Sequence, residues 1–444
     1  MPAIEHSPVL RAGTAIGDCY TIIDFLGKGV SAKVYSAIDC VHGRKVAVKH
    51  FEHWDGAARQ CRREVSTMRK LTEADKEGIF VPQLIETFVK DGRHVIIMEF
   101  VEGRTLKAVM AETRTVRGRR DAGLDMHDIR KVMSCLVRTF EFLESNGIHI
   151  LHGDVKPDNI VLTEGPGGDA RLIDYGLAYA VNTMEKNMYI QSRWYRSPEV
   201  LLGIPATHAI DVWSAGVVLV ELFSGFVPFR GDSSFDQMEQ IVNAIGGPPP
   251  SMRARCEAIT LEKLDEISDN ATYDFEVSPS ATGSRKGRHE EDMEDKPPSS
   301  ESKHDRFIRA LSCVRPLRDG ETQQEMEAAV DLASRMLVLE PLDRISSSEA
   351  AFHAFLQPPS PKASNAPVPP SPKGISPKKS VKYEDRLALL SLNKGVEKSS
   401  GAGSKKTMSE EVTRTSSSNS FFARNRASWI QSFSTAATGR RRAA

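Results

Sequence analysis

Short apolar runs alternate with glycine-containing turns in the first part of the chain. Residues 20–50 contain YTIIDFLGKG, AKVYSAID and KVAVKHF, a pattern typical of three strands joined by turns. In residues 61–71 the apolar side chains recur at helical spacing, which predicts a helix. Residues 81–101 predict two further strands joined by a turn at Asp91 and Gly92. This region therefore predicts a small sheet accompanied by one helix.

From about residue 105 the pattern becomes mostly helical, and it is clearest at 128–147 and 209–225. The most apolar stretch, 211–229, carries an aspartate and a glutamate and has a proline near its end. A membrane-spanning helix needs about 20 predominantly apolar residues. We therefore interpret this stretch as a buried helix and expect no membrane span. The pattern as a whole predicts a small sheet domain followed by a larger helical domain.

Two segments interrupt this pattern. Residues 253–305 are polar and charged, and we predict a disordered insertion within them from about 275 onward. Residues 357–444 are rich in Ser, Pro, Lys and Arg and contain three Ser-Pro-Lys triplets. This composition predicts a disordered tail with one short helix at 383–392.

Charge is distributed unevenly between these parts. The chain has 59 basic and 59 acidic side chains, but residues 357–444 carry sixteen Lys and Arg against five Asp and Glu. The tail is therefore basic by about +11 and the remainder is acidic by the same amount. A basic tail is suited to anionic partners or to nuclear entry, and a linker-like tail is the alternative.

The six cysteines are scattered, without a CxxC pair or a neighbouring cluster of histidines. This spacing favours neither a disulfide framework nor a zinc site, and it indicates a reducing compartment. The N-terminal sequence has no apolar run suited to a signal peptide. We therefore expect the protein in the cytoplasm, in the nucleus or in both.

Residues 27–34, GKGVSAKV, fit the phosphate-covering pattern G-x-G-x-x-G-x-V except that Ala32 replaces the third glycine. Glycine lets backbone N–H groups approach phosphates closely, and alanine is the smallest departure from it. A plain hairpin turn would explain the same residues, so this motif is weak when taken alone.

Lys49 closes the strand pattern VAVK and is a candidate cation for the α- and β-phosphates of ATP. Such a lysine needs a partner that holds it in place. Glu64, on the predicted helix 61–71, is the candidate. The alternatives are a solvated strand-end lysine and an ordinary surface glutamate.

The stretch LHGDVKPDNIVL, residues 151–162, is dense in polar groups and bounded by apolar ones. Asp154 is the candidate that accepts or orients the substrate hydroxyl proton, and Lys156 would stabilise the phosphoryl group during transfer. Asn159 and Asp174 are the candidate ligands of Mg²⁺. Asp174 follows a strand pattern in LIDYGLA, so an Asx turn at a strand end is its alternative.

Taken together, these motifs resemble those of eukaryotic protein kinases, and the resemblance covers about residues 16–356. It implies a bilobal α+β fold. A small antiparallel β N-lobe with one helix is expected at about 16–101, and a larger helical C-lobe at about 102–356. A short extension, 1–15, precedes this domain.

The resemblance also assigns an adenine-binding hinge, with Met98 as its gatekeeper. The residues implied to contact ATP are Leu26, Gly27, Lys28, Gly29, Val34, Ala47, Lys49, Met98, Glu99 and Val101. In the family, a glutamate equivalent to Glu199 pairs with an arginine equivalent to Arg344. An aspartate equivalent to Asp211 braces the catalytic loop.

The stretch MYIQSRWYRSPEVLLG, residues 188–203, resembles the activation segment of the dual-specificity Tyr-regulated, homeodomain-interacting and CLK-like kinases of the CMGC group. In these relatives a small residue often replaces the arginine of His-Arg-Asp, as Gly153 does here. Tyr189 matches a tyrosine that they phosphorylate on themselves, and Arg193 and Arg196 are the candidate partners of its phosphate. The alternative is that Tyr189 simply packs.

The predicted function is phosphoryl transfer from ATP, with Mg²⁺, to Ser or Thr of protein substrates. A preference for Pro after the target residue follows from the subfamily resemblance alone. We expect a monomer that requires no nucleic acid. A pseudokinase scaffold is one alternative, raised by Ala32, Gly153 and Tyr175, which replaces the Phe of Asp-Phe-Gly and needs a partner for its hydroxyl. A small-molecule phosphotransferase is another, because HGDVKPDN also fits the His-Gly-Asp-x4-Asn pattern of aminoglycoside and choline kinases.

Overall fold

The computed structural model describes residues 7–118, 122–145, 147–163, 169–181, 190–256, 264–265, 267, 301–312 and 314–357. All of these belong to one compact unit of the chain. Most of the predicted insertion, the predicted tail beyond residue 357, and Tyr189 lie outside the described residues.

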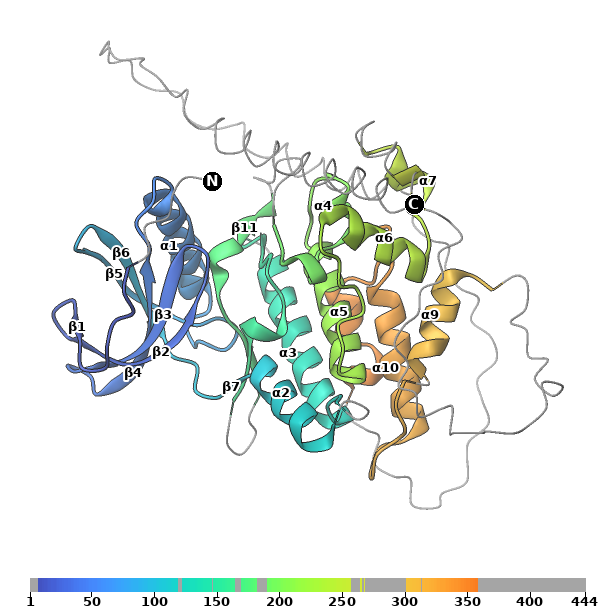
Figure 1. The fold of residues 1–444 in the computed structure, drawn as a ribbon, viewed down its shortest axis with the longest axis horizontal. Coiled ribbons are helices and arrows are strands. Elements are labelled where there is room, and N and C mark those ends of the chain that lie inside the picture. Colours follow the sequence, from blue (N-terminus) through green and yellow to red (C-terminus); the bar gives the residue numbers. More distant parts are fainter. Residues whose placement is uncertain are drawn as a thin grey trace, which may run out of the picture. The chain divides into compact units, whose positions relative to one another are not determined.

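A six-stranded antiparallel sheet forms the first part of this unit (Figure 1). Its strand order is β1-β2-β3-β4-β6-β5. The strands are β1 (Ala15–Ile16), β2 (Tyr20–Lys28), β3 (Ala32–Asp39), β4 (Arg44–Phe51), β5 (Leu84–Lys90) and β6 (Arg93–Glu99). Between β5 and β6, φ is 49° at Asp91 and 72° at Gly92. Two successive positive φ angles are typical of a two-residue hairpin, so the turn predicted at these residues is confirmed.

Helix α1 (Ala57–Ala74) covers one face of this sheet beside β5 and β6. It contains the predicted helix 61–71 and extends beyond it at both ends. Its buried residues include Glu64, Met68 and Leu71, which follow one another at helical spacing. The apolar face of α1 therefore places a glutamate toward the interior of the protein.

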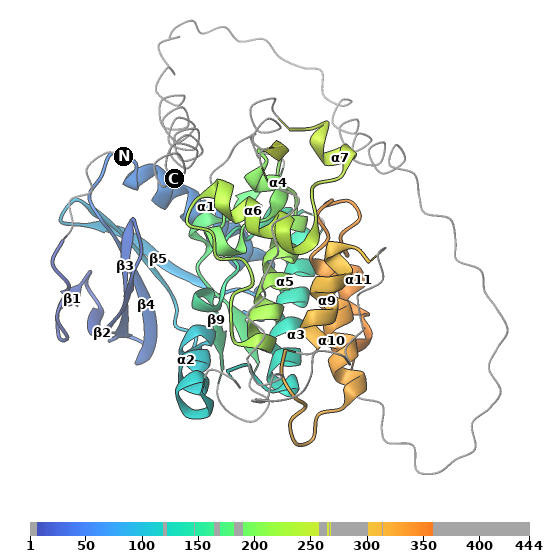
Figure 2. The same ribbon diagram turned by 45° about the vertical axis from the view of Figure 1, so that its right-hand side comes forward.

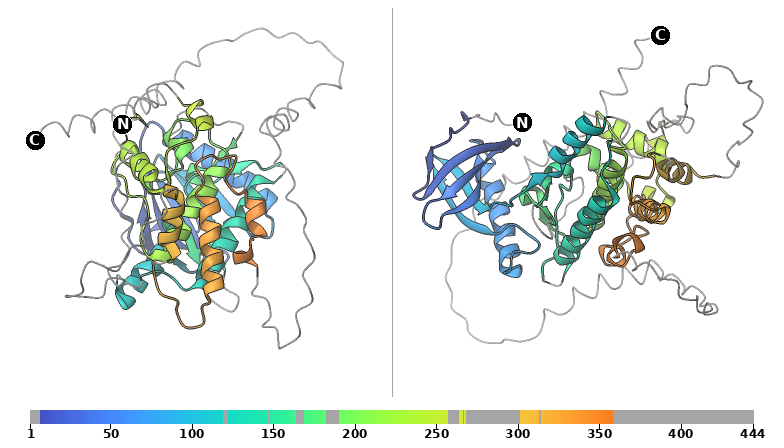
Figure 3. Two further views of the ribbon diagram at one scale, coloured as in Figure 1. Left: turned by 90° about the vertical axis from the view of Figure 1, so that its right-hand side faces the viewer. Right: turned by 90° about the horizontal axis from the view of Figure 1, so that it is seen from below.

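The rest of the unit is mainly helical (Figures 2 and 3). Its helices are α2 (Leu106–Arg117), α3 (Met126–Glu144), α4 (Pro198–Leu201), α5 (Ala209–Ser224), α6 (Ser234–Ile245), α7 (Pro250–Arg253), α9 (Lys303–Ser312), α10 (Gln323–Met336) and α11 (Ser347–Ala351). It also contains two small antiparallel sheets, of strand order β10-β9-β7 and β11-β8. Their strands are β7 (Arg104–Thr105), β8 (Ile150–Leu151), β9 (Ile160–Leu162), β10 (Ala170–Leu172) and β11 (Tyr179–Ala180). The fold predicted from the periodicity, a sheet lobe followed by a helical lobe, is confirmed.

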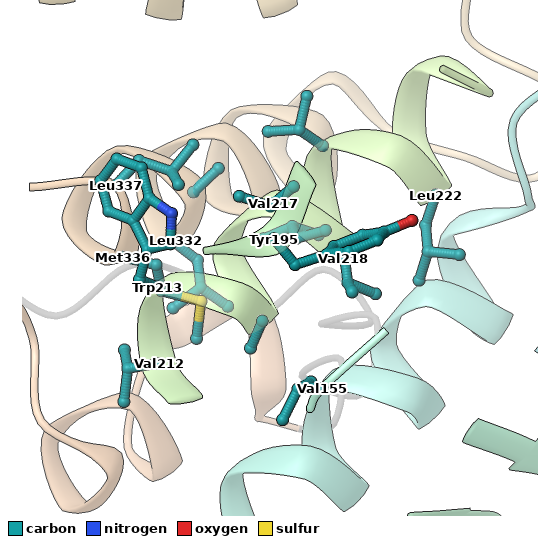
Figure 4. Close-up of a cluster of buried hydrophobic side chains, with 14 of the residues drawn as sticks. Val155, Tyr195, Val212, Trp213, Val217, Val218, Leu222, Leu332, Met336 and Leu337 are labelled. Atoms are coloured by element: carbon teal, nitrogen blue, oxygen red, sulfur yellow. The ribbon is translucent and has the colours of Figure 1, made fainter. Parts of the chain in front are cut away.

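Helix α5 is the centre of the helical lobe and packs between α3 and α10. Every residue from Ile210 to Ser224 is buried, which confirms the buried helix predicted there. Figure 4 shows Trp213 and Val217 of α5 near Met336 and Leu337 at the end of α10. Within the described ranges, no helix is long and apolar enough to cross a membrane.

Candidate active site

The polar residues of the site stand on turns that follow short strands. The loop from His152 to Asn159 follows β8, and Asp174 follows β10. Asp174 has a left-handed backbone, with φ 64° and ψ 82°, and its Oδ1 accepts the Gly176 N–H at 3.2 Å. Asp174 therefore makes the local turn contact expected at a strand end, and its carboxylate has a second, longer-range partner.

That partner is Lys49 of β4. Its contact with Asp174 links the sheet lobe to the helical lobe. Lys49 Nζ donates to Oε1 of Glu64 at 2.6 Å and to Oδ1 of Asp174 at 2.8 Å. The side chains of Lys49 and Glu64 are 9% and 1% exposed, and that of Asp174 is 44% exposed. The structure therefore brings three separately predicted residues into one network, in which neither Lys49 nor Glu64 is a surface residue.

Opposing effects determine the pKa values in this network. Although its side chain is 44% exposed, partial desolvation of the Asp174 carboxylate disfavours the charged form, but the adjacent Lys49 ammonium outweighs this effect and lowers the pKa of Asp174 to about 2. Burial also opposes the charge on Lys49, yet Asp174 and Glu64 together raise the pKa of Lys49 above its usual value. For Glu64 burial dominates and raises the pKa, while Lys49 acts in the opposite direction. At neutral pH, Lys49 and Asp174 therefore form an ion pair.

A second side chain, Arg63, ties α1 to the residues after Asp174. Its Nη2 donates to the carbonyl oxygen of Gly176 at 3.0 Å. Its guanidinium carbon lies 4.3 Å from the centroid of the Tyr179 ring, and Nη1 donates to the Tyr179 hydroxyl. This contact helps hold α1 in the position from which Glu64 reaches Lys49.

Asp154 lies in the centre of a cluster of donors. Lys156 Nζ donates to its Oδ2 at 2.7 Å, and Asn159 Nδ2 donates to its Oδ2 at 3.0 Å and to its backbone oxygen at 2.9 Å. Ser192 Oγ donates to its Oδ1 at 2.7 Å. Both carboxylate oxygens therefore have fixed partners, which hold the Asp154 side chain in one orientation.

The backbone of this loop is held by Asp211 of α5. The N–H groups of His152 and Gly153 donate to its two carboxylate oxygens at 2.6 and 2.9 Å. Gly153 has φ 73°, and a Cβ atom there would lie 2.8 Å from the carbonyl oxygen of Leu177. A left-handed backbone costs about 1–2 kcal/mol for other residues. Gly153 therefore relieves backbone strain, a local reason for glycine that is independent of regulation.

Asn159 and Asp174 suit a magnesium ion. Asn159 uses its Nδ2 for Asp154, and in the described part of the chain neither its Oδ1 nor Asp174 Oδ2 accepts a hydrogen bond from a protein group. Mg²⁺ prefers oxygen ligands and usually combines one or two carboxylates with substrate phosphates. Among the described residues, no cluster of three or more His, Cys, Asp or Glu could hold a metal. Phosphate and water oxygens would therefore complete its coordination.

Most of the residues predicted to contact ATP lie on the strands β2, β3, β4 and β6, while Gly29 and Val101 lie just beyond the ends of β2 and β6. Gly27 of β2 pairs with Val34 of β3, and Ala47 of β4 pairs with Met98 of β6. Glu99 is the last residue of β6, so the predicted hinge begins where the sheet ends. Because β2, β3, β4 and β6 are consecutive neighbours in the sheet, the positions on these strands lie on β4, which carries Lys49, or within two strands of it.

Ala32, the departure from the glycine pattern, is a sheet residue. It is the first residue of β3, pairs with Phe51 and is 3% exposed. Its side chain belongs to a small apolar cluster with Phe51, Cys61 and Ile96. The methyl group therefore contributes to the core of the sheet lobe, while the N–H of Gly29 closes the turn by donating to the Ala32 carbonyl oxygen at 2.8 Å.

Ser192 is a site residue that no sequence motif identified. In addition to its bond with Asp154, its Oγ accepts from Lys156 Nζ at 2.9 Å. It lies 38 residues from Asp154 in the sequence. In the sequence, Ser192 directly follows Tyr-Ile-Gln in the stretch that resembles an activation segment. That resemblance did not predict a hydrogen bond between this serine and Asp154.

We expect Ser192→Ala to lower kcat by roughly 10- to 100-fold, because a hydrogen bond to a charged group contributes about 1.5–3 kcal/mol. Ser192→Thr retains the hydroxyl and serves as the control, with a smaller loss. The measurement is steady-state phosphorylation of a generic protein substrate. A Ser192→Ala enzyme within twofold of the unmodified protein would show that this hydroxyl does not position Asp154.

Tyr175 fills the apolar position expected for its ring but lacks the expected partner for its hydroxyl. It is 1% exposed, and its ring meets the His152 ring edge-on at a centroid distance of 4.7 Å. It packs in the cluster that contains Met68 and Leu71 of α1. In the part of the chain that the structure describes, its hydroxyl makes no hydrogen bond. Burial also raises the pKa of Tyr175, so the hydroxyl stays neutral.

Tyr175→Phe is therefore expected to stabilise the protein. An unpaired buried polar group costs about 1–3 kcal/mol, and phenylalanine removes it while preserving the ring. Tyr195→Phe is the matched control, since the buried Tyr195 hydroxyl donates to Glu221 Oε2 at 2.7 Å and its loss should destabilise. Thermal denaturation of the three proteins gives the comparison. A lower melting temperature for Tyr175→Phe would mean that its hydroxyl has a partner.

Arg193 and Arg196, the two arginines predicted to hold a phosphate on Tyr189, have different partners in the structure. Arg196 is 2% exposed, and its guanidinium donates to the carbonyl oxygens of Ile190 and Gln191 at 2.9 and 2.8 Å. Arg193 Nη1 donates to the Asp232 carbonyl oxygen at 2.6 Å. Arg196 therefore lies against the chain that follows Tyr189, and its pairing with a phosphate stays a prediction.

Glu199 and Arg344 form a buried ion pair. The Arg344 Nη atoms donate to the two Glu199 oxygens at 2.7 and 3.0 Å, and the side chains are 1% and 0% exposed. Arg344 also donates to the carbonyl oxygens of Ala209, Val338 and Leu339. The five N–H groups of this guanidinium therefore bind α4 through Glu199, the start of α5 through Ala209, and the segment after α10 through Val338 and Leu339.

Comparison with known proteins agrees with this fold. The family described as protein kinase domain matches residues 20–356 of the chain. The chain therefore belongs to the protein kinase family.

Individual relatives indicate which protein kinases the chain resembles. The chain is 32% identical over 238 residues to homeodomain-interacting protein kinase 1 of Caenorhabditis elegans, and 28% identical over 341 residues to dual specificity tyrosine-phosphorylation-regulated kinase 2 of Drosophila melanogaster. It is 29% identical over 359 residues to homeodomain-interacting protein kinase 4 of Homo sapiens. The alignments cover 53%, 76% and 76% of this chain and 27%, 41% and 55% of those relatives. The predicted subfamily resemblance is confirmed, and the chain spans about a quarter to just over half of their length.

Proposed function

We propose that this protein is an ATP-dependent protein kinase that phosphorylates serine or threonine residues of other proteins. One observation carries the proposal: Lys49 contacts both Glu64 and Asp174, while Asp154 is held by Lys156, Asn159 and Ser192. Phosphoryl transfer depends mainly on positioning and on charge stabilisation, which is what such a network supplies.

In this proposal Lys49 binds the α- and β-phosphates of ATP, and Glu64 holds it in place. Asp154 accepts the proton of the substrate hydroxyl as its oxygen attacks the γ-phosphorus, and ADP departs. Lys156 stabilises the negative charge on the phosphoryl oxygens, and Ser192 orients Asp154. A bound Mg²⁺, held by Asn159 and Asp174, would neutralise phosphate charge.

The test is phosphate transfer from labelled ATP to a generic basic protein, with choline and an aminoglycoside as separate acceptors. We expect label on serine or threonine of the protein and none on the small molecules. Label on a small molecule alone would favour the phosphotransferase alternative. ATP binding without transfer to any acceptor would favour the pseudokinase scaffold.

Two finer features belong to the same proposal. The likeness to the homeodomain-interacting and dual-specificity kinases supports a preference for proline after the target residue, which a peptide array would measure. It also supports autophosphorylation of Tyr189, although Tyr189 lies outside the described residues. Mass spectrometry of active protein made in bacteria tests the latter, and an unmodified Tyr189 would contradict it.

We further propose a monomer located in the cytoplasm, in the nucleus or in both, whose basic tail binds anionic partners. The composition of residues 357–444 supports the assignment of the tail. Deleting these residues and comparing the distribution of the two proteins in cells tests it, and an unchanged distribution would contradict a role of the tail in localisation.

A further inference from the structure

A buried polar cluster lies on the face of the sheet opposite Lys49. Successive residues of a strand point to opposite faces. Val34 pairs with Lys49, and the preceding residue, Lys33, pairs with His50. Lys33 and His50 therefore lie on the other face, where they are 2% and 6% exposed. Lys33 Nζ donates to Glu52 Oε1, and Arg93 Nη1 lies 3.3 Å from Glu52 Oε2.

Ser7 closes this cluster from the N-terminal side. Its N–H and its Oγ both donate to Glu52 Oε2 at 2.9 Å. Lys33 Nζ donates to the Ser7 carbonyl oxygen at 2.8 Å and to Ser7 Oγ at 3.1 Å. Ser7 is thus bound by both members of a buried ion pair that lies far from it in the sequence.

The residues after Ser7 continue across the same face as a strap, which we define as residues 7–14. The N–H of Leu10 donates to the Tyr35 hydroxyl at 3.2 Å, and Leu10 packs on the apolar cluster of this face. The N–H of Gly13 donates to the Ile22 carbonyl oxygen at 2.8 Å, and the Ile22 N–H donates to the Thr14 carbonyl oxygen at 2.9 Å. The strap is therefore attached to β2 and β3 at several points, with Ser7 at its outer end.

The Ser7 anchor is directly connected to the loop that is proposed to cover the ATP phosphates. The N–H of Glu52 donates to the carbonyl oxygen of Ser31, within that loop, at 2.8 Å. Lys33 pairs with Lys28 at the base of the same loop. A change at Ser7 therefore acts on Glu52 and Lys33, two residues that contact this loop.

Ser7 is followed by Pro8, the dipeptide that proline-directed kinases phosphorylate. We propose that Ser7 is a regulatory phosphorylation site whose modification releases the strap and loosens the phosphate-covering loop. In the modification, a proline-directed kinase transfers the γ-phosphoryl group of ATP to Ser7 Oγ. The bond from the γ-phosphorus to the bridging oxygen breaks, the Oγ–P bond forms, ADP leaves and the hydroxyl proton is released.

Electrostatics gives the direction of the effect. Burial opposes the charge on Glu52, but its bonds with Lys33 and Ser7 outweigh this and lower its pKa to about 2, so it is ionised at neutral pH. A phosphate on Ser7 adds about −1.5 to −2 charges, and beside a carboxylate such a group disrupts structure through repulsion and desolvation. It also removes the hydroxyl hydrogen that Ser7 donates to Glu52. Lys33 and Arg93 already pair with Glu52. A phosphate on Ser7 would therefore compete with the Glu52 carboxylate for these two cations.

The experiment uses the full chain carrying Asp154→Asn, treated with an added proline-directed kinase. Mass spectrometry measures occupancy at Ser7, and hydrogen exchange follows residues 7–14 and 27–34 before and after treatment. The same chain with Ser7→Ala is the matched control, because its Ser-Pro sites in the tail remain available. We expect exchange of the Leu10 and Gly13 amides to become about tenfold faster only when Ser7 is phosphorylated.

Failure to modify Ser7 while the tail sites are modified would overturn the proposal, as would unchanged or slower exchange after modification. A second measurement uses the chain with Asp154 intact, and it rests on the proposed kinase function. There, phosphorylation of Ser7 is expected to raise the KM for ATP several-fold with little change in kcat. A protein without any kinase activity would refute the proposed function, while the exchange experiment would still decide the role of Ser7.

Discussion

Asp154→Asn is expected to reduce phosphoryl transfer by about 10²- to 10⁴-fold, the usual contribution of a positioned general base. Asparagine has nearly the same size as aspartate but cannot accept the substrate proton. It also turns one end of the side chain into a donor that faces the donors of Lys156, Asn159 and Ser192. The loss should appear in kcat, because Asp154 acts on the hydroxyl during transfer.

The measurement is initial-rate phosphorylation of a generic protein with labelled ATP. Asp158→Asn is the matched control: Asp158 lies on the same loop, and its partner is the exposed Lys107 at 2.5 Å. We expect the control to stay within about twofold of the unmodified protein, since exposed ion pairs contribute about 0–1 kcal/mol. Unchanged activity in Asp154→Asn would mean that Asp154 is not the base.

Arg344→Leu is expected to destabilise the protein by about 3–5 kcal/mol, the usual cost of removing one partner of a buried ion pair. The substitution leaves the Glu199 carboxylate, which is 1% exposed, without the two hydrogen bonds that Arg344 donates to it. It also leaves the carbonyl oxygens of Ala209, Val338 and Leu339 without the arginine. Because these contacts join α4 and the start of α5 to the segment after α10, the effect should extend across the helical lobe.

Urea denaturation followed by fluorescence measures this change as a shift of the unfolding midpoint. The double variant Glu199→Leu with Arg344→Leu should recover part of the loss, because it no longer contains an unpaired buried charge. Arg335→Leu removes an exposed pair with Asp331 and should change stability by less than about 1 kcal/mol. A midpoint for Arg344→Leu equal to that of Arg335→Leu would refute a stabilising role for the buried pair.

Local patterns predicted much of the fold because their causes are local. The β5–β6 hairpin follows from its turn residues, because Asp91 and Gly92 are residue types that adopt positive φ angles readily. Helix α5 follows from a long apolar stretch that only the interior of the protein can accommodate. The ends of α1 were less predictable: the apolar spacing indicated 61–71, whereas packing against β5 and β6 supports a helix over Ala57–Ala74.

The chemistry was predictable to the extent that it depends on residue types at fixed spacing. Asp154, Lys156 and Asn159 stand within six positions, so a single loop could be identified as their common site. Ser192 could not be found in this way, because its contact with Asp154 joins residues that are 38 positions apart. The same reason applies to Ser7, which meets Glu52 across a sequence separation of 45 residues.

The class of protein, the order of its two lobes and the candidate catalytic groups could be inferred from the sequence, because these features depend on periodicity and on motifs along the chain. Contacts between groups far apart in the sequence could be identified from the folded structure alone. It paired Lys49 with both carboxylates, left the Tyr175 hydroxyl unpaired within the described residues, and placed Ser7 on a buried ion pair. Those contacts depend on how whole strands and helices pack, and packing is a property of all the elements together.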